Sequence, residues 1–198
     1  NVAGDAANGI AGNRELTIEN SGEITVSGEG AWGAAVAVDS LISNTGTVTV
    51  SGAGSTGLEV GARSATVNEL GGTMVIEAPA VDAVALRGKS GANAVVNQGT
   101  ITSSADSSTA IFVEDSVIQG LNSGTIELSA DDATGMRGGA GSRVINDAEA
   151  TLQIQGANAI GLSAQRGGQA SNSGTITLNG AGARGQVGGA GDVPQGMT

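Results

Sequence analysis

The sequence predicts an all-β fold, a right-handed parallel β-helix of about seven coils with about 25 residues and three short strands in each coil. Three observations lead to this prediction. The chain holds 35 glycines and only 2 prolines among 198 residues, yet it contains many short aliphatic runs such as ITV, VTV and MVI. A short phrase recurs along the chain, and apolar residues alternate with others after each copy. Glycines that punctuate many short strands explain this composition better than a disordered linker does.

The phrase is typified by NSGTITLNG, which begins at Asn172 and has close copies at Asn20 and Asn122. Its third residue serves as a reference position, and successive references are 24 to 27 residues apart. The reference residues are Gly22, Gly46, Gly72, Gly99, Gly124, Ala150 and Gly174. Because side chains alternate between the two faces of a strand, the pair that follows each reference lines one face. These pairs are Ile24/Val26, Val48/Val50, Met74/Ile76, Ile101/Ser103, Ile126/Leu128, Leu152/Ile154 and Ile176/Leu178.

Two further short strands are expected in each coil. One follows the phrase, at Val36/Val38, Leu58/Val60, Val84/Leu86, Ile111/Val113, Met136 and Ile160/Leu162, whereas the last copy, GARGQV, lacks the pattern. The other precedes the phrase, at Leu16/Ile18, Leu41 or Ile42, Thr66/Val67, Val95/Val96, Val117/Ile118 and Val144/Ile145. One such unit cannot bury its apolar side chains alone, but stacked units can. With strands ~4.8 Å apart, the coils form a rod roughly 35 Å long.

The repeats follow one another without a linker, so residues 1–198 are predicted to form a single β-helix segment. The regular coils span about 16–187. The ends are expected to be frayed or cut from a longer chain, since termini are often poorly ordered and residue 1 is not Met.

Every copy of the repeat has an asparagine at the bend before the reference position. The seven are Asn20, Asn44, Asn68, Asn97, Asn122, Asn146 and Asn172. Asparagine tolerates the left-handed backbone conformation and can bond its own backbone, which suits a bend. In stacked coils the side-chain amides can also bond one another as a ladder. We therefore expect these asparagines to be structural, with ligand contact as the minor alternative.

The residue content excludes several kinds of chemistry. The chain has no cysteine and no histidine, which removes disulfides, thiolate nucleophiles, zinc sites built on these residues and Ser-His triads. A formal net charge of −11 argues against nucleic acid and anionic membrane as partners. No stretch reaches the apolar length of a membrane helix. We expect neither an enzyme nor a cofactor or metal site, because adjacent carboxylates such as Glu114 and Asp115 suit solvated turns.

The phrase, a glycine-rich turn and a short AI or GL strand together resemble the repeats of autotransporter passenger domains, the exported parts of type V secretion proteins. The resemblance runs from about Leu16 to about Val187. It implies secretion through an outer-membrane barrel that this sequence does not show, and display on the surface of a Gram-negative cell. Many such passengers are adhesins or self-associating proteins that act in cell aggregation and biofilms. The absence of cysteine agrees with this, because a chain that crosses a pore unfolded should avoid disulfides.

Charged residues are predicted to form two edges along the rod. The turn after the phrase strand gives an acidic edge without Lys or Arg, formed by Glu29, Glu77, Asp106, Asp131 and Asp132. A mixed basic edge follows the second strand, with Arg63, Arg87, Lys89, Arg137, Arg143 and Arg166. One interpretation is that solvated turns are simply polar, since single surface charge pairs contribute little. The sharper hypothesis is lateral association, in which many weak contacts between the edges of neighbouring rods add together.

These features favour an extracellular adhesin or self-associating segment, whose partner is a second copy or a host surface protein or glycan. One alternative is a passive stalk that presents another module and binds nothing along its length. Another is an ice-binding solenoid, because the pairs Thr47/Thr49, Thr100/Thr102 and Thr175/Thr177 face outward. This third reading is the least favoured, since charged and long side chains interrupt the threonine lattice and threonine is also a good strand former.

Overall fold

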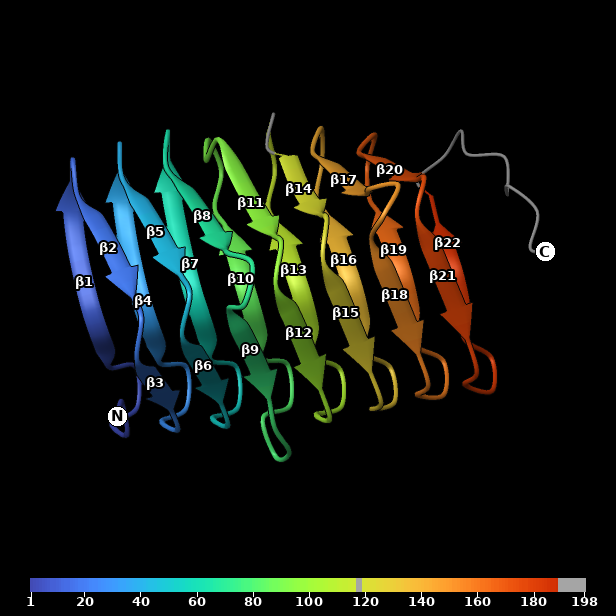
Figure 1. Ribbon diagram of the computed structural model, residues 1–198, viewed down its shortest axis with the longest axis horizontal. Coiled ribbons are helices and arrows are strands. Elements are labelled where there is room, and N and C mark those ends of the chain that lie inside the picture. Colours follow the sequence, from blue (N-terminus) through green and yellow to red (C-terminus); the bar gives the residue numbers. More distant parts are fainter. Residues whose placement is uncertain (117–118, 189–198) are drawn as a thin grey trace.

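Three parallel sheets wind around one apolar core in the computed structural model, which describes residues 1–116 and 119–188 (Figure 1). Each complete coil contributes one strand to each sheet, and strands pair with their equivalents in the neighbouring coils. None of the described residues belongs to a helix, so no helix long and apolar enough to span a membrane is found among them. The arrangement fits a right-handed parallel β-helix, which confirms the predicted fold class.

The described residues form 22 strands. Sheet 1 contains β1 (Asn8–Arg14), β4 (Trp32–Val38), β7 (Thr56–Ala62), β10 (Val84–Gly88), β13 (Thr109–Val113), β16 (Thr134–Gly138), β19 (Ile160–Ala164) and β22 (Arg184–Val187). Sheet 2 contains β2 (Thr17–Asn20), β5 (Leu41–Asn44), β8 (Ala65–Asn68), β11 (Ala94–Asn97), β14 (Gln119–Asn122), β17 (Arg143–Asn146) and β20 (Gln169–Asn172). Sheet 3 contains β3 (Glu23–Val26), β6 (Thr47–Val50), β9 (Thr73–Ile76), β12 (Thr100–Ser103), β15 (Thr125–Leu128), β18 (Thr151–Ile154) and β21 (Thr175–Leu178).

The core is a stack of aliphatic side chains from the inner faces of the three sheets. The strand after each phrase supplies the file Ile24, Val48, Met74, Ile101, Ile126 and Leu152, and all six are buried. Sheet 1 supplies Leu58, Leu86, Ile111, Met136 and Leu162 at equivalent heights. Burying each such side chain contributes about 1.5–3 kcal/mol, so each coil gains most of its stability from contact with its neighbours.

Three strands lie where the alternation of residues did not place them. β1 precedes Leu16 and pairs with β4, and β22 pairs with β19 although GARGQV lacks an aliphatic pattern. β14 begins at Gln119, and the expected pair Val117/Ile118 lies outside the described residues. Backbone N–H and C=O groups pair whatever the side chain, so a neighbouring strand extends the ladder beyond the apolar pattern.

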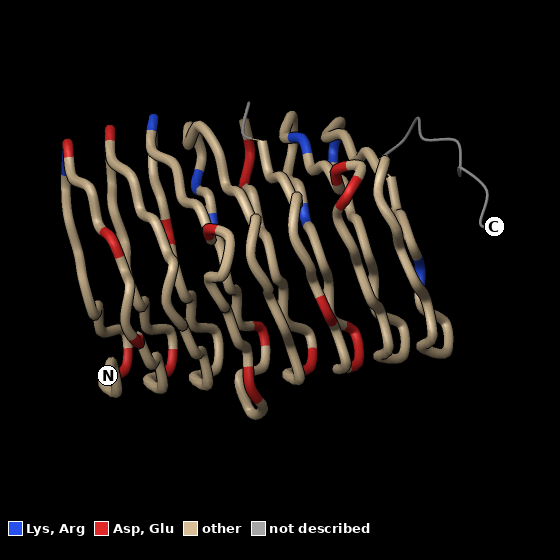
Figure 2. Tube along the Cα trace, viewed as in Figure 1, with Lys and Arg blue, Asp and Glu red and all other residues tan. Residues whose placement is uncertain are grey.

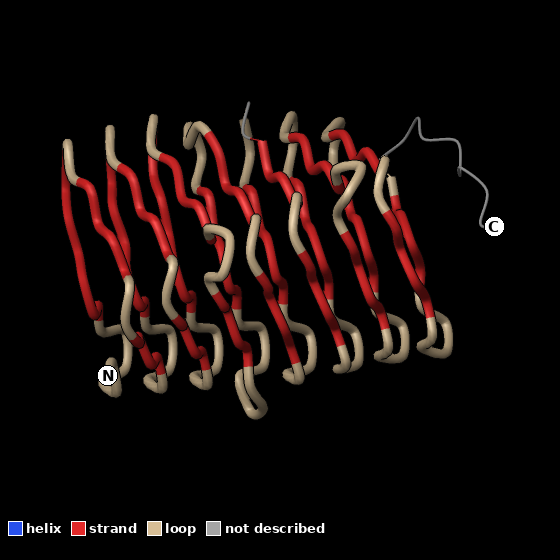
Figure 3. The backbone as a smooth tube through the Cα atoms, in the orientation of Figure 1, coloured by secondary structure: helices blue, strands red, loops and turns tan. Residues whose placement is uncertain are grey.

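The strands alternate with short turns along the whole described chain (Figure 3). Each turn from sheet 3 to sheet 1, and the equivalent segment before β1, contains one residue with a left-handed backbone. These stacked residues are Ala6, Gly30, Gly54, Asp82, Ser107, Asp132, Asn158 and Gly182. Because a left-handed residue recurs at the equivalent position of every such turn, the turns keep the same backbone shape, even where a polar residue replaces glycine.

Candidate interaction surfaces

The seven asparagines form a continuous hydrogen-bonded ladder inside the bend between sheets 2 and 3. Each Nδ2 donates to the Oδ1 of the next asparagine over 2.7 to 2.8 Å, from Asn20 through to Asn172. The same amide also donates to a nearby backbone carbonyl, as Asn44 does to Gly46 over 3.1 Å. The central five side chains are fully buried. Their hydrogen bonds therefore join each coil to the next.

The backbone at this bend differs from the left-handed conformation that the sequence suggested. None of the seven asparagines has a positive φ; each ends a strand of sheet 2 and remains in the parallel ladder. Apart from Gly71, which lies in the longer bend before β9, the left-handed residues lie in the other two turns, for example Asp132 in one and Asp39 in the other. Asparagine is used at the bend for its side-chain donor and acceptor, which a stack of identical amides can satisfy.

The turns from sheet 3 to sheet 1 carry the predicted acidic edge, visible as red segments along the lower side of the rod in Figure 2. The structure adds Asp5 and Asp82 to the five predicted residues. We define the acidic edge as Asp5, Glu29, Glu77, Asp82, Asp106, Asp131 and Asp132, all of which are exposed. Asp5 was missed because it precedes the first phrase, and Asp82 because this coil has two extra residues in the turn.

Three carboxylates of the acidic edge also support the stack. Asp5 Oδ1 accepts the backbone N–H of Glu29 over 3.1 Å, and Asp106 Oδ1 accepts that of Asp131 over 3.2 Å. Asp131 Oδ1 in turn accepts the N–H of Ala157 over 2.7 Å. Each bond runs to the next coil, so these aspartates both connect coils and present negative charge to solvent.

The six predicted basic residues do not meet at one corner. Arg87 and Arg137 lie within strands of sheet 1, and Arg143 begins a strand of sheet 2. The other three, Arg63, Lys89 and Arg166, lie in turns. The reason is that an arginine within a strand projects from the face of its sheet rather than from a turn. Arg137, Arg143 and Arg166 are exposed and form no ion pair among the described residues.

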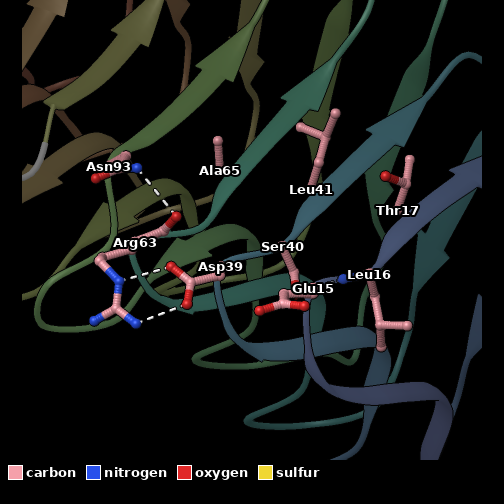
Figure 4. Close-up of a pocket in the computed structure, with 9 residues that line it drawn as sticks. All are labelled: Glu15, Leu16, Thr17, Asp39, Ser40, Leu41, Arg63, Ala65 and Asn93. Atoms are coloured by element: carbon pink, nitrogen blue, oxygen red, sulfur yellow. Dashed lines mark hydrogen bonds and ion pairs between the residues drawn. The ribbon is translucent and has the colours of Figure 1, made fainter.

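Arg63 is the clearest case of internal neutralisation. Its guanidinium makes two parallel hydrogen bonds to Asp39, from Nε over 2.6 Å and from Nη2 over 2.7 Å. Both residues line a shallow depression between sheets 1 and 2, where Asn93 donates to the Arg63 carbonyl over 3.0 Å (Figure 4). The depression is therefore lined by a charge pair that is already satisfied.

We expect Arg63 to keep Asp39 ionised to lower pH. Its hydrogen bonds hold the pKa of Asp39 below the ordinary value of 3.8. A carboxyl whose pKa is lowered by folding contributes stability above its ordinary pKa and loses it as the pH falls through the lowered value. The contribution should be small, because Arg63 is exposed and Asp39 is partly exposed, so that solvent screens the pair. NMR titration should show the Asp39 pKa rising in Arg63→Gln and unchanged in Arg166→Gln; an unchanged Asp39 titration in Arg63→Gln would contradict this assignment.

The outer face of sheet 1 holds a cluster that the two predicted edges do not describe. Its outward file runs Glu59, Arg87, Phe112 and Arg137 through four successive strands. The Phe112 ring lies near both guanidiniums, 5.4 Å from that of Arg87 and 5.2 Å from that of Arg137. The outward direction of these four residues can be predicted from the sequence, because each is adjacent to an inward residue, as Glu59 is to Leu58.

Most charges in this cluster are also satisfied within the rod. Glu59 is only 7% exposed, accepts the Trp32 indole N–H over 3.0 Å and pairs with Lys89 over 3.1 Å. Arg87 pairs with Glu59 over 3.7 Å and also with Glu114. These contacts link successive coils on the outside of the sheet, which indicates a stabilising role.

The outer face of sheet 3 presents threonines. One file is unbroken over six strands, through Thr47, Thr73, Thr100, Thr125, Thr151 and Thr175. The second file contains Thr49 and Thr102 but also Val75, Glu127 and Gln153. The face therefore has one regular file of threonines rather than the two-file lattice that an ice-binding surface would need.

The carboxylates that the structure describes lie in separate turns and strands of the rod. Within residues 1–116 and 119–188, no group of three or more side chains could hold a metal ion. The adjacent Glu114 and Asp115 have separate tasks: Glu114 pairs with Arg87, whereas Asp115 Oδ1 accepts the N–H of Ala140 over 2.8 Å. Both carboxylates are thus used to connect coils.

Comparison with known proteins gives one partial match. Residues 122–197 match a family model described as the BigA third pectate lyase-like domain, which covers less than half of the chain. The likeness agrees with the β-helix and with an origin in a bacterial surface protein, located outside the cell or at its surface. Neither the curated proteins nor the solved structures provide a match.

Proposed function

We propose that the chain is a segment of a secreted adhesin, displayed by an autotransporter-type route, whose rods associate with one another through charged edges. The observation that carries this proposal is the acidic edge: seven exposed carboxylates follow one side of the rod, and its turns contain no Lys or Arg. These carboxylates lie at several levels along the rod, so the edge offers similar contacts in more than one coil. Contacts that are individually weak can then add through multivalency.

The complementary groups on a second rod are exposed arginines that the rod does not neutralise itself. Among the described residues, Arg137, Arg143 and Arg166 fit this description, whereas Arg63, Arg87 and Lys89 are paired with carboxylates of their own rod. Of the predicted basic edge, therefore, only the arginines without an ion pair among the described residues are proposed to contact a second rod. A host protein or glycan that carries positive charge is the alternative partner for the acidic edge.

A catalytic role has less support, although the matched family is described as pectate lyase-like. A shared fold does not bring an activity with it, since function depends on the site. The carboxylates described above lie at separate turns or are bonded to neighbouring coils. We therefore propose a binding role without a cofactor.

Aggregation of beads coated with the chain tests the proposal. We expect clumping at about 0.05 M salt and a clear decrease at about 0.5 M salt, where charges are screened beyond a few ångströms. The double variant Arg137→Gln/Arg166→Gln should clump several-fold less than the native chain. The matched control, Thr102→Glu/Thr177→Glu, makes the same change in net charge on the outer face of sheet 3 and should clump as the native chain does.

Two results would count against adhesion through the edges. Clumping that is unaffected by salt and by the arginine double variant would remove the charge mechanism. Beads that stay dispersed under all conditions would favour the passive stalk, which needs no contact along this segment.

A further inference from the structure

The outer face of sheet 2 carries an aliphatic stripe that the charged edges do not involve. Val67, Val96, Leu121 and Ile145 occupy one outward file in β8, β11, β14 and β17. All four side chains are partly exposed, and the file ends in serine on either side, at Ser43 and Ser171. Single exposed aliphatic residues are ordinary, whereas a contiguous aliphatic stripe on the outside of a sheet is a candidate interaction surface.

The files beside the stripe carry opposite charges at the same height. Arg143 lies two residues before Ile145 in β17, and Asp147 lies two residues after it at the bend. Both are exposed. Arg143 projects from the same outer face as Ile145, because side chains alternate along a strand. Asp147 is the first residue of the bend after β17, and its Oδ1 accepts the N–H of Ala148 over 2.9 Å. The stripe is therefore flanked by a positive group on one side and a negative group on the other.

We propose that two copies of this rod pair side by side through the sheet 2 faces, with both rods pointing in the same direction. A two-fold axis parallel to the rod places each coil opposite the same coil of its partner and reverses the direction of the strands. Each residue of the stripe then faces its own copy. Arg143 faces Asp147 of the other copy, and this attractive contact occurs twice.

Charge distinguishes this arrangement from the antiparallel one. A two-fold axis parallel to the strands, centred on the stripe, would place Val67 opposite Ile145 of the other copy. It would then bring Asp147 opposite Glu69 twice and leave Arg143 opposite Ala65. The parallel pairing has a single like-charged contact, Glu19 with its own copy, at the end of the face where solvent screens it.

The size of the face suits a weak dimer. Its seven strands at ~4.8 Å and about five residues at ~3.3 Å give roughly 500 Å² per partner. The total of roughly 1,000 Å² is at the low end of specific protein interfaces. Such a contact becomes useful when rods are held close together on one surface, where their effective concentration is high. It pairs neighbours on the same cell and uses a different face from the proposed adhesive edges.

Sedimentation of the chain in solution tests the pairing. We expect a reversible monomer–dimer equilibrium between about 10 μM and 1 mM. Leu121→Asp, which places a charge on the two-fold axis, should weaken the dimer at least tenfold, and its unchanged thermal melting would show that the fold is intact. The control Thr102→Asp on sheet 3 should leave the dimer unchanged. A chain that remains monomeric throughout, or a dimer that tolerates Leu121→Asp, would overturn the proposal.

Charge exchange tests the direction of the rods. In the parallel dimer, Asp147→Arg meets Arg143 of the other copy and weakens association, and the double variant Arg143→Asp/Asp147→Arg restores it. In the antiparallel dimer, Asp147→Arg would meet Glu69 and strengthen association, which would overturn the parallel arrangement. These measurements use soluble chain instead of coated beads, and they substitute Leu121, Arg143 and Asp147 instead of Arg137 and Arg166, so failure of either proposal can be recognised separately.

Discussion

Gly124→Ala should reduce the free energy of unfolding by ~2–4 kcal/mol, although it adds only one methyl group. Gly124 is a reference glycine of the repeated phrase, and it lies directly above the same position of the previous coil. A Cβ at Gly124 would approach the Gly99 carbonyl oxygen too closely and would lie 2.7 Å from the Gln98 carbonyl group. These atoms belong to the backbone of a paired coil, so they cannot move away without disturbing the ladder.

Gly22→Ala is the matched control for this substitution. Gly22 holds the same place in the first copy of the phrase, where an added Cβ meets nothing within 4 Å. Its free energy of unfolding should change by no more than ~0.5 kcal/mol. Urea unfolding followed by circular dichroism measures both variants. Equal destabilisation of the two would show that the phrase needs glycine for its backbone conformation rather than for the close stacking of coils.

Asn97→Ala should reduce the free energy of unfolding by ~2–4 kcal/mol, because it opens the ladder at its buried centre. Asn97 Nδ2 donates to Asn122 Oδ1 over 2.8 Å, and its Oδ1 accepts from Asn68 Nδ2 over 2.8 Å. It also donates to the Gly99 carbonyl over 3.2 Å. Alanine removes all of these bonds and leaves polar atoms that water cannot reach.

Asn172→Ala tests the same chemistry at the exposed end of the ladder. Asn172 accepts from Asn146 over 2.8 Å, and within the described part of the chain it donates only to the Gly174 carbonyl, where water can replace it. We expect a loss of less than ~1 kcal/mol in its free energy of unfolding. If Asn97→Ala cost no more than Asn172→Ala, the ladder would not be a source of stability.

The sequence was sufficient to predict the coils because the period and the alternation of inward residues report the same arrangement. Each reference glycine, each asparagine and each following apolar pair recurs at nearly equal spacing. A fold of stacked coils places all of these residues in equivalent positions. The strands that escaped prediction, β1 and β22, have few aliphatic residues and are held by backbone pairing with a neighbour. Such pairing leaves little trace in side-chain patterns.

The candidate surfaces were harder to predict because side-chain direction depends on register. The acidic turns were found because every residue of a turn is near solvent. The basic residues were grouped by their distance from a reference glycine, which ignores whether a residue lies in a strand or after it. The aliphatic stripe was overlooked for a related reason: Val96 and Ile145 follow the buried residues Val95 and Val144 and were counted with them.

The hydrogen bonds of the asparagine ladder run only from one coil to the next. No coil has to wait for a distant part of the chain before it can form. If the chain is delivered with one end first, each finished coil offers the following segment a ready edge and an unsatisfied amide. Folding can then proceed coil by coil in one direction, and every added coil makes backward slippage of the chain less favourable.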